Sequence, residues 1–363
     1  MSKPGRYLLL LGPYPPPFGG VSVHLLRLLK VLDESQVPHV LVARTLKDPV
    51  SSRIIPSGTR IRFLRNITRH LEHAFCVHDH SEHYQWKSFP ASFFFFWTIR
   101  RSGRPWLLTI HDGTFPQRMQ KANPISRFLI RSQLRRYSEV VVINKELGET
   151  VRSLGVEPSR VSLIKSFIPF HYEPPPLDDE LRMFLDSHRP IIAVSGAFHA
   201  TYHFDVVAEA FLKVRTMHAS AGLIFISGSF TRSVNLEAQV RHLSDPVKES
   251  VFFAHDLPPA ALLTVIRRSN MFIRSAFPDG DGMSMREAMV LGIPVVASET
   301  GHRPEGVRTY SPKNPDHLAA AILKTLEGRE DLDAIAQRTA RESREQADSL
   351  LTIYKRYMSV PAP

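Results

Sequence analysis

Short apolar runs alternate with amphipathic stretches along almost the whole chain, and this alternation constrains the fold more than any other feature. The first apolar run covers residues 7–12, and in residues 21–32 leucines recur at helical spacing. Apolar runs of this length predict buried strands, and apolar residues three or four apart predict helices. Strands that alternate with helices form parallel βαβ units, so the sequence predicts a doubly wound α/β sheet.

The same alternation continues in both halves of the chain. Further strands are expected over 37–43, 106–111, 139–144, 161–165, 191–196, 223–228, 250–254, 271–274 and 294–298. Helices are expected over 126–136, 146–154, 203–217, 234–243, 259–268, 284–291, 316–326 and 331–357.

Residues 168–190 interrupt this rhythm. Prolines at 169 and 174–176 precede an acidic run at 178–180, a composition typical of a linker. A chain of 363 residues is also long enough for two domains. We therefore expect one Rossmann-like domain over 1–170 and a second over 188–344, and we leave open whether a final helix near 345–363 packs back on the first.

The positive charge of the chain is confined to its first half. Lysine and arginine number 46 against 35 aspartate and glutamate residues, a formal charge of +11. Residues 1–175 carry 25 basic and 12 acidic side chains, and residues 176–363 carry 21 and 23, so the halves have net charges of +13 and −2. The first half is therefore expected to face an anionic partner. Nucleic acid is disfavoured, because the sequence holds no recognition-helix, RNP or zinc-finger pattern.

Cysteine content and hydropathy indicate the compartment. The chain has a single cysteine, Cys76, which excludes an internal disulfide and a cysteine-based metal site. The apolar stretch near the N-terminus is too short for a signal-peptide core, and no apolar run approaches the ~18 residues that span a bilayer. We expect a cytoplasmic protein.

The most informative segment is DGDGMSMREAM, residues 279–289, where two acidic residues lie eight positions apart. Gly280 and Gly282 let the backbone come close to a ligand, and the start of the following helix offers free N–H groups to a phosphate. Glu287 is placed to accept hydrogen bonds from a ribose diol, and Asp279 to hold a sugar hydroxyl. The alternative is a surface turn with a helix cap, where acidic residues are common.

This segment, with LGIPVVAS at 291–298, resembles the E-x7-E region of the retaining glycosyltransferases of family 4, the glycosyl transferases group 1. The family pattern is E-G-F-G-x-x-x-x-E-A-M followed by G-x-P-V-V-A-S. The loop GPYPPPFGGV, residues 12–21, resembles the family's first βα loop, whose glycine pair is Gly19 and Gly20 here.

A third similarity lies at residues 109–113, TIHDG, which match the family's T-x-H-D pattern. The resemblance implies that His111 reaches the donor sugar or the acceptor, whereas a lone histidine is otherwise more often structural. Asp112 is better suited to cap the segment that follows it.

The resemblance implies a fold, an activity and a set of site residues. The fold is two Rossmann-like parallel-sheet domains that face each other across a cleft (GT-B). The N-terminal domain binds a glycan or lipid-linked acceptor, and the C-terminal domain binds a nucleotide diphosphate sugar. Sugar transfer would retain the anomeric configuration, in polysaccharide or glycoconjugate biosynthesis, with no metal and no other cofactor. The implied catalytic residues are His111, Asp279 and Glu287, and the implied donor-binding residues are Gly19, Gly20, Gly196, Gly280, Asp281, Gly282, Met283 and Ser284.

One departure from the family pattern concerns the donor diphosphate. The family's second domain begins with G-R-L-x-x-x-K-G, but Ala197 and Tyr202 occupy the positions of its two cations. Each lost charge-assisted contact costs about 1.5–3 kcal/mol. The candidate substitutes are His199, His203, Arg274, Arg303 and the backbone N–H groups of residues 280–284. The alternative function is a binding subunit with weak or no transferase activity in a polysaccharide assembly complex.

The basic half also contains a stretch that mixes aromatic residues with cations. Phenylalanines and a tryptophan fill residues 93–97, between Lys87 and Arg100. Interfacial membrane segments have this composition, although for residues 93–97 by themselves a core helix with a solvated basic end is favoured. Arginines also gather at 60–69 and 127–136. We therefore expect the N-terminal domain to make peripheral contact with an anionic membrane at its inner face.

Overall fold

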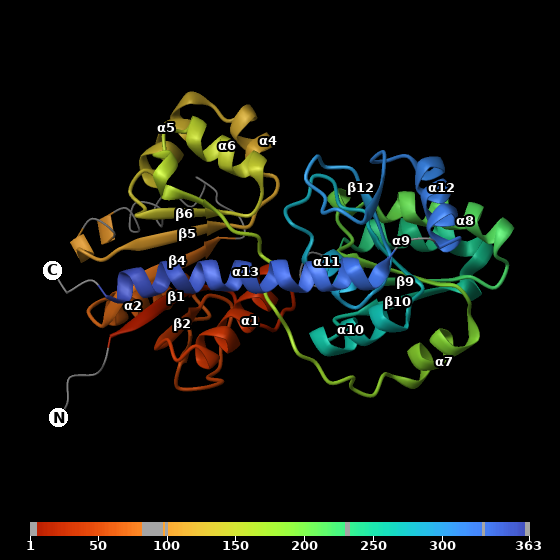
Figure 1. Cartoon of the computed structure of the whole chain (residues 1–363), viewed down its shortest axis with the longest axis horizontal. Helices are drawn as coiled ribbons and strands as arrows, with labels where there is room; N and C mark the ends of the chain where they lie inside the picture. The colour runs from red at the N-terminus through yellow and green to blue at the C-terminus, as the bar shows by residue number, and fades with distance from the viewer. Residues whose placement is uncertain (1–5, 82–96, 99–100, 229–232, 329–330, 360–363) are drawn as a thin grey trace. The chain divides into compact units, whose positions relative to one another are not determined.

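The computed structural model describes residues 6–81, 97–98, 101–228, 233–328 and 331–359. The chain divides into unit 1, Met1–Pro169 with Ser343–Pro363, and unit 2, Phe170–Glu342. Each unit holds one sheet of parallel strands with helices on both faces (Figure 1). The predicted α/β class is confirmed in both units.

Unit 1 is built on a seven-stranded sheet of order β3-β2-β1-β4-β5-β6-β7. Its strands are β1 Tyr7–Gly12, β2 His39–Ala43, β3 Ile54–Pro56, β4 Ala74–Ser81, β5 Trp106–Ile110, β6 Glu139–Val142 and β7 Val161–Leu163. Its helices include α1 Gly20–Glu34, α2 Arg60–Leu71, α4 Phe115–Lys121, α5 Pro124–Leu134 and α6 Lys145–Ser153.

Both faces of this sheet are covered, which explains the continuous apolar run of β1. Leu9 and Leu11 pack into a core shared with α2, α4, α5 and α6, while Leu8 and Leu10 pack into a core shared with α1. Successive side chains of a strand point to opposite faces, so a strand buried on both faces has no polar alternation.

Strand β4 was not expected from the sequence, although it lies at the centre of the sheet between β1 and β5. Its second half, after Val77, carries His78, Asp79 and His80, and a run of polar residues conceals a buried strand from an apolar-pattern search. All three side chains are nevertheless buried. The sheet brings them hydrogen-bond partners, which makes their burial tolerable.

The last helix, α13 Leu332–Met358, contains the boundary between the units at Ser343. Leu350, Ile353 and Tyr354 of its second half belong to the same core of unit 1 as α1. The Tyr354 hydroxyl lies 2.7 Å from Nδ1 of His78, so the helix is tied to the polar part of β4.

Unit 2 has a six-stranded sheet of order β10-β9-β8-β11-β12-β13. Its strands are β8 Ile191–Gly196, β9 Gly222–Ser227, β10 Val251–His255, β11 Met271–Arg274, β12 Val295–Ser298 and β13 Val307–Tyr310. Its helices are α7 Asp179–Ser187, α8 Phe204–Met217, α9 Val234–Ser244, α10 Pro259–Arg268, α11 Met283–Val290 and α12 Pro315–Leu326. Helices α8, α9 and α12 cover one face, and α7, α10 and α11 cover the other.

The prediction of a linker over 168–190 was wrong in its second half. Helix α7 begins at Asp179, with Asp178 as its N-cap, and buries Leu181 and Leu185 under the sheet. The acidic run that suggested a linker is the cap and first turn of this helix, where carboxylates are favourable. Strand β13 was also missed, because only one of its four residues is buried.

Of the aromatic segment at 93–97, all but Trp97 lies outside the described residues. Within the ranges that the structure does describe, no helix combines the length and apolar character that crossing a bilayer requires.

Candidate active site

In unit 2, the loop between β11 and α11 holds Asp279 between two arginines. Arg274, the last residue of β11, donates to both carboxylate oxygens at 2.9 and 2.6 Å. Arg303 donates to Oδ2 at 2.7 Å and also binds the backbone oxygen and hydroxyl of Ser298. The side chain of Asp279 is 5% exposed, that of Arg274 12% and that of Arg303 3%. We name Arg274, Asp279 and Arg303 the arginine clamp.

The clamp carries one net positive charge. Burial by itself would raise the pKa of Asp279, but the guanidinium groups of Arg274 and Arg303 outweigh burial and hold this pKa well below its usual range. The carboxylate is therefore ionised and already bound on both oxygens. The predicted contact of Asp279 with a sugar hydroxyl stays a prediction. In the structure, Asp279 binds and orients the guanidinium groups of Arg274 and Arg303.

Tyr202 fills the position where the family pattern has a lysine. Its ring packs on Gly196, where an added Cβ would lie 2.2 Å from Tyr Cδ1, and the Arg274 guanidinium lies 5.3 Å from the ring centroid. Ser275 and Phe277 hydrogen-bond the backbone oxygens of Tyr202 and Thr201. The β8–α8 loop is thus fixed against the end of β11, with Arg274 stacked on the ring.

The start of α11 lies directly on the clamp. Its N-cap Gly282 has a φ of 60°, and an added Cβ would lie 3.1 Å from Oδ2 of Asp279 and 3.4 Å from Nη1 of Arg303. Ser284 is joined to Ser195 of β8 by a hydroxyl–hydroxyl bond of 2.9 Å. Free N–H groups at a helix start attract anions, so the helix start and the clamp together form an electropositive corner.

Two further predicted residues lie on or beside α11. Asp281 accepts a 2.7 Å bond from the buried guanidinium of Arg286, which also reaches Glu342 at 3.4 Å. Glu287 is buried one turn into the helix, at 3% exposure. Donor contacts of Asp281, Met283 and Glu287 stay predictions.

The two histidines considered as substitute cations lie elsewhere in unit 2. His199 and His203 line a pocket of about 410 Å³ together with Phe198, Asp205 and Lys313 among others. None of the arginine clamp residues lines this pocket. The four side chains that could replace the missing cations therefore lie in two places: His199 and His203 at the pocket, and Arg274 and Arg303 at the start of α11.

In unit 1, the glycine pair opens α1. Gly19 is the N-cap, and its N–H donates to the Ser22 hydroxyl at 2.9 Å, which in turn donates to the backbone oxygen of Pro17. A Cβ added to Gly20 would meet nothing within 4 Å. The predicted donor contacts of Gly19 and Gly20 stay predictions.

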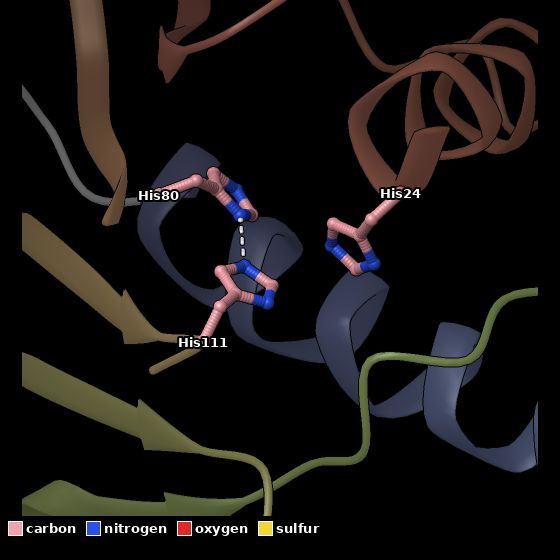
Figure 2. Close-up of side chains that lie close together, drawn as sticks. All are labelled: His24, His80 and His111. Atoms are coloured by element: carbon pink, nitrogen blue, oxygen red, sulfur yellow. Dashed lines mark hydrogen bonds between the residues drawn. The ribbon is translucent and has the colours of Figure 1, made fainter. Parts of the chain in front are cut away.

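His111 follows the end of β5 and does not stand alone. His80, near the end of the neighbouring strand β4, places Nδ1 3.1 Å from Nε2 of His111, and His24 of α1 completes a group of three rings (Figure 2). Ser166 binds two of them: its backbone oxygen lies 2.6 Å from Nδ1 of His24, and its hydroxyl lies 3.1 Å from Nδ1 of His111. We name His24, His80 and His111 the histidine triad.

The histidine triad is neutral at physiological pH. Burial lowers the pKa of His24 to about 4, and it lowers the pKa values of His80 and His111 well below the usual histidine range. His24 and His80 are fully buried, while His111 keeps part of its surface accessible. The neighbouring Asp112 accepts from the N–H and hydroxyl of Thr114 at 2.8 and 2.6 Å, so it orders the turn before α4, but the N-cap of that helix is Thr114 and not Asp112 as expected.

Two family models match consecutive parts of the chain. Residues 19–165 match the glycosyl transferase 4-like domain, and residues 182–342 match glycosyl transferases group 1. The chain belongs to the glycosyl transferases group 1 family. The histidine triad thus lies in the 4-like domain, and the arginine clamp in the group 1 domain.

Solved structures share the two-domain GT-B fold of this glycosyltransferase. A sucrose-phosphate synthase from Thermosynechococcus elongatus has 18% identity and a TM-score of 0.68, over 97% of this chain and 98% of that one. Anabaena Alr3699/HepE, in complex with UDP and glucose, has 12% identity and a TM-score of 0.68, over 98% and 100%. An apo structure of OtsA has 12% identity and a TM-score of 0.67, over 98% and 100%. No curated protein sequence matches the chain.

Sequence reasoning found His111 and Asp279 but missed most of their partners. His24 and His80 were not singled out, because His80 lies on the strand that the apolar pattern did not reveal. Arg274 and Arg303 were only two of several candidate cations. The one available signal was position: Arg274 ends a predicted strand, where ligands bind in parallel sheets.

Proposed function

We propose that this glycosyltransferase binds a nucleotide diphosphate sugar in unit 2 and transfers the sugar, with retention of configuration, to a glycan or lipid-linked acceptor bound by unit 1. The solved structures of HepE hold UDP with glucose and UDP-glucose, which supports a donor of this chemical class. The product would enter polysaccharide or glycoconjugate biosynthesis.

The arginine clamp is the observation that carries this proposal. A diphosphate needs cations, and the two cationic positions of the family loop hold Ala197 and Tyr202. Arg274 and Arg303 lie at the start of α11 and are oriented by Asp279, so the electropositive corner is assembled without those two positions. Arg274 keeps 12% of its side chain exposed, which leaves it the more accessible of the two.

In the proposed reaction, the bond between the anomeric carbon and the diphosphate oxygen breaks as the acceptor oxygen attacks from the same face. The acceptor proton passes to the departing diphosphate, so no separate base is required. Negative charge develops on the leaving oxygen, where preorganised cations and N–H groups lower the barrier most. Unit 2 offers both, in the clamp and in the start of α11. His111 would orient the sugar or the acceptor, and Glu287 the ribose.

The test of this function is transfer of labelled sugar from a panel of nucleotide sugars to a membrane lipid extract, with wild type, Glu287→Ala and the exposed control Glu249→Ala. We expect transfer by wild type and the control and none by Glu287→Ala, and circular dichroism checks that each variant is folded, because Glu287 is buried and its loss lowers the unfolding midpoint. NMR of the product's anomeric proton distinguishes retention from inversion. Full activity of Glu287→Ala would overturn the assignment of this residue.

A second candidate function rests on the same Ala197 and Tyr202. Without the family's two cations, the chain could serve as a GT-B binding subunit with weak or no transfer in a polysaccharide assembly complex. Calorimetry against the same nucleotide sugars separates the two: micromolar binding favours the enzyme, and no binding to any of them favours the subunit.

The location that we propose is the cytoplasm, with peripheral contact to the inner face of an anionic membrane. The support is the basic unit 1, in which helix α5 exposes Ile125 and Phe128 beside Arg127 and Arg131. Large apolar side chains flanked by arginines are typical of interfacial helices.

A further inference from the structure

The histidine triad has the shape of a metal site. The ring centroids lie 5.3 Å apart for His24 and His80, 5.0 Å for His24 and His111, and 5.4 Å for His80 and His111. The rings therefore form a nearly equilateral triangle around one point, with each ring supplied by a different element (Figure 2). One nitrogen from each ring lies within 4.8 Å of the others.

These separations are close to what a tetrahedral ion requires. Zinc binds imidazole nitrogen at about 2.0–2.1 Å, which places two ligand nitrogens about 3.3 Å apart. Nδ1 of His80 and Nε2 of His111 are already 3.1 Å apart. Closing the remaining separations needs a shift of about 1.5 Å, which ring rotation can supply.

Ser166 orients two of the rings as the outer partners of metal ligands do. A backbone carbonyl can only accept, so Nδ1 of His24 carries the proton and its Nε2 presents a lone pair. The Ser166 hydroxyl binds Nδ1 of His111 and leaves Nε2 of that ring facing the triad. Metal-binding histidines almost always hydrogen-bond through their second nitrogen to a carbonyl, hydroxyl or carboxylate in this way.

The triad also holds buried nitrogens that nothing satisfies. Nε2 of His24 and Nε2 of His80 are both buried without a hydrogen-bond partner. A buried unpaired polar atom costs about 1–3 kcal/mol and calls for a ligand, an ion or a catalytic role. In His24, the unpaired atom is the one whose lone pair Ser166 exposes, so it supports the site directly, whereas the unpaired Nε2 of His80 is not the ligand atom and would carry the proton when Nδ1 binds the ion.

We propose that His24, His80 and His111 form a binding site for a divalent transition-metal ion, best matched by zinc. Three neutral imidazoles suit zinc, copper, nickel and iron, whereas magnesium and calcium require oxygen ligands, of which the triad has none. Three protein ligands leave one coordination position open for water or an anion. The site shares His111 with the proposed transfer reaction, but that reaction requires no metal, so the two proposals are tested separately.

The test titrates the metal alone, so it does not depend on any sugar or nucleotide. The chelator-treated full chain is titrated with Zn²⁺ by calorimetry and with Co²⁺ by visible absorption. We expect one equivalent to bind, with the intense absorption of a tetrahedral cobalt site. His24→Ala and His80→Ala should each weaken binding at least tenfold, because each removes a ligand. The control is His242→Ala, whose imidazole is exposed in unit 2.

A structural loss is separated from a ligand loss in two ways. Ser166→Ala keeps all three rings and should weaken binding less than His24→Ala, and circular dichroism monitors folding of each variant. Absence of one-equivalent binding to wild type, or equal affinity in wild type, His24→Ala and His80→Ala, would overturn the proposal. Either result would identify the histidine triad as a metal-free hydrogen-bonded network.

Discussion

At the residue scale, the arginine clamp shows a structural role of Asp279 that the sequence did not indicate: it holds two arginine side chains in place. The family resemblance places an acidic residue at this position, and its chemistry suggests a contact with sugar. In the structure its two oxygens bind Arg274 and Arg303, which lie five residues before it and 24 after it in sequence, and the sugar contact stays a prediction. Such convergence depends on how β11 and the loop after β12 meet, so residue type and spacing could not reveal it.

Arg274→Ala should weaken the binding of a nucleoside diphosphate by about tenfold or more, because Arg274 is the more accessible arginine of the clamp and a charge-assisted contact of about 1.5–3 kcal/mol is lost. The affinity is measured by calorimetry with UDP and other nucleoside diphosphates. Arg267→Ala, an exposed arginine of the same unit, should leave the affinity unchanged. Equal affinities in wild type and Arg274→Ala would show that the clamp does not contact the diphosphate.

Gly282→Ala tests whether the start of α11, next to the arginine clamp, contributes to nucleotide binding. Gly282 and Gly301 both have positive φ, at 60° and 78°, so alanine at either costs about 1–2 kcal/mol of stability. Only at Gly282 would the new methyl lie 3.1 Å from Asp279, since nothing lies within 4 Å at Gly301. We expect both variants to lower the thermal unfolding midpoint and only Gly282→Ala to weaken nucleotide binding. Equal weakening in both would contradict this role.

At the scale of elements, hydropathy predicted most strands that are buried by apolar side chains, but it missed the short edge strands β3 and β13 and the central strand β4, whose second half is buried by polar side chains. Most predicted elements agree with the structure to within about two residues, a usual boundary error. β4 failed because His78, Asp79 and His80 look like a loop. His78 is bonded by Thr109 of β5 and Tyr354 of α13, Asp79 by Arg44 and His80 by His111, and no local pattern contains these partners. The histidine triad was missed for the same reason.

The bond between β4 and α13 gives a test at this scale. Tyr354→Phe removes the hydroxyl that satisfies Nδ1 of the buried His78 and should destabilise unit 1 by about 1–3 kcal/mol. Thr352→Ser, on the exposed face of the same helix, should have little effect. All three tryptophans belong to unit 1, so urea unfolding followed by tryptophan fluorescence reports this unit alone. Equal midpoints would contradict the structural role of this bond.

The same pair predicts a pH dependence. Burial raises the pKa of Tyr354 well above its usual range, while the unfolded phenol titrates near about pH 10. Because the folded pKa is the higher one, the contribution of Tyr354 is complete below about pH 10 and is lost as the pH rises further. The difference in unfolding free energy between wild type and Tyr354→Phe should therefore shrink between about pH 9.5 and 11. A constant difference would exclude this coupling.

At the scale of the whole molecule, the structure widens the charge asymmetry that the sequence indicated. Unit 1, with its C-terminal segment, contains 28 basic and 13 acidic residues, whereas unit 2 contains 18 and 22. The net charges are therefore +15 and −4. The C-terminal residues that complete the core of unit 1 are themselves net positive. A charge confined to one folding unit is consistent with the anionic membrane surface that we propose as the partner of unit 1.

Helix α5 is where this charge meets exposed apolar surface. Ile125 and Phe128 lie three residues apart, hence on one helical face, and are 72 and 68% exposed. Each arginine near an anionic surface contributes about 1 kcal/mol to membrane binding, and burial of these two apolar side chains in the bilayer interface contributes further. The double variant Ile125→Ser with Phe128→Ser should therefore reduce sedimentation with phosphatidylserine vesicles at least tenfold. Met217→Ser with Val234→Ser, equally exposed in unit 2, should not. Binding should also fall as salt rises; salt-independent binding, or equal loss in both double variants, would contradict the proposed membrane contact through α5.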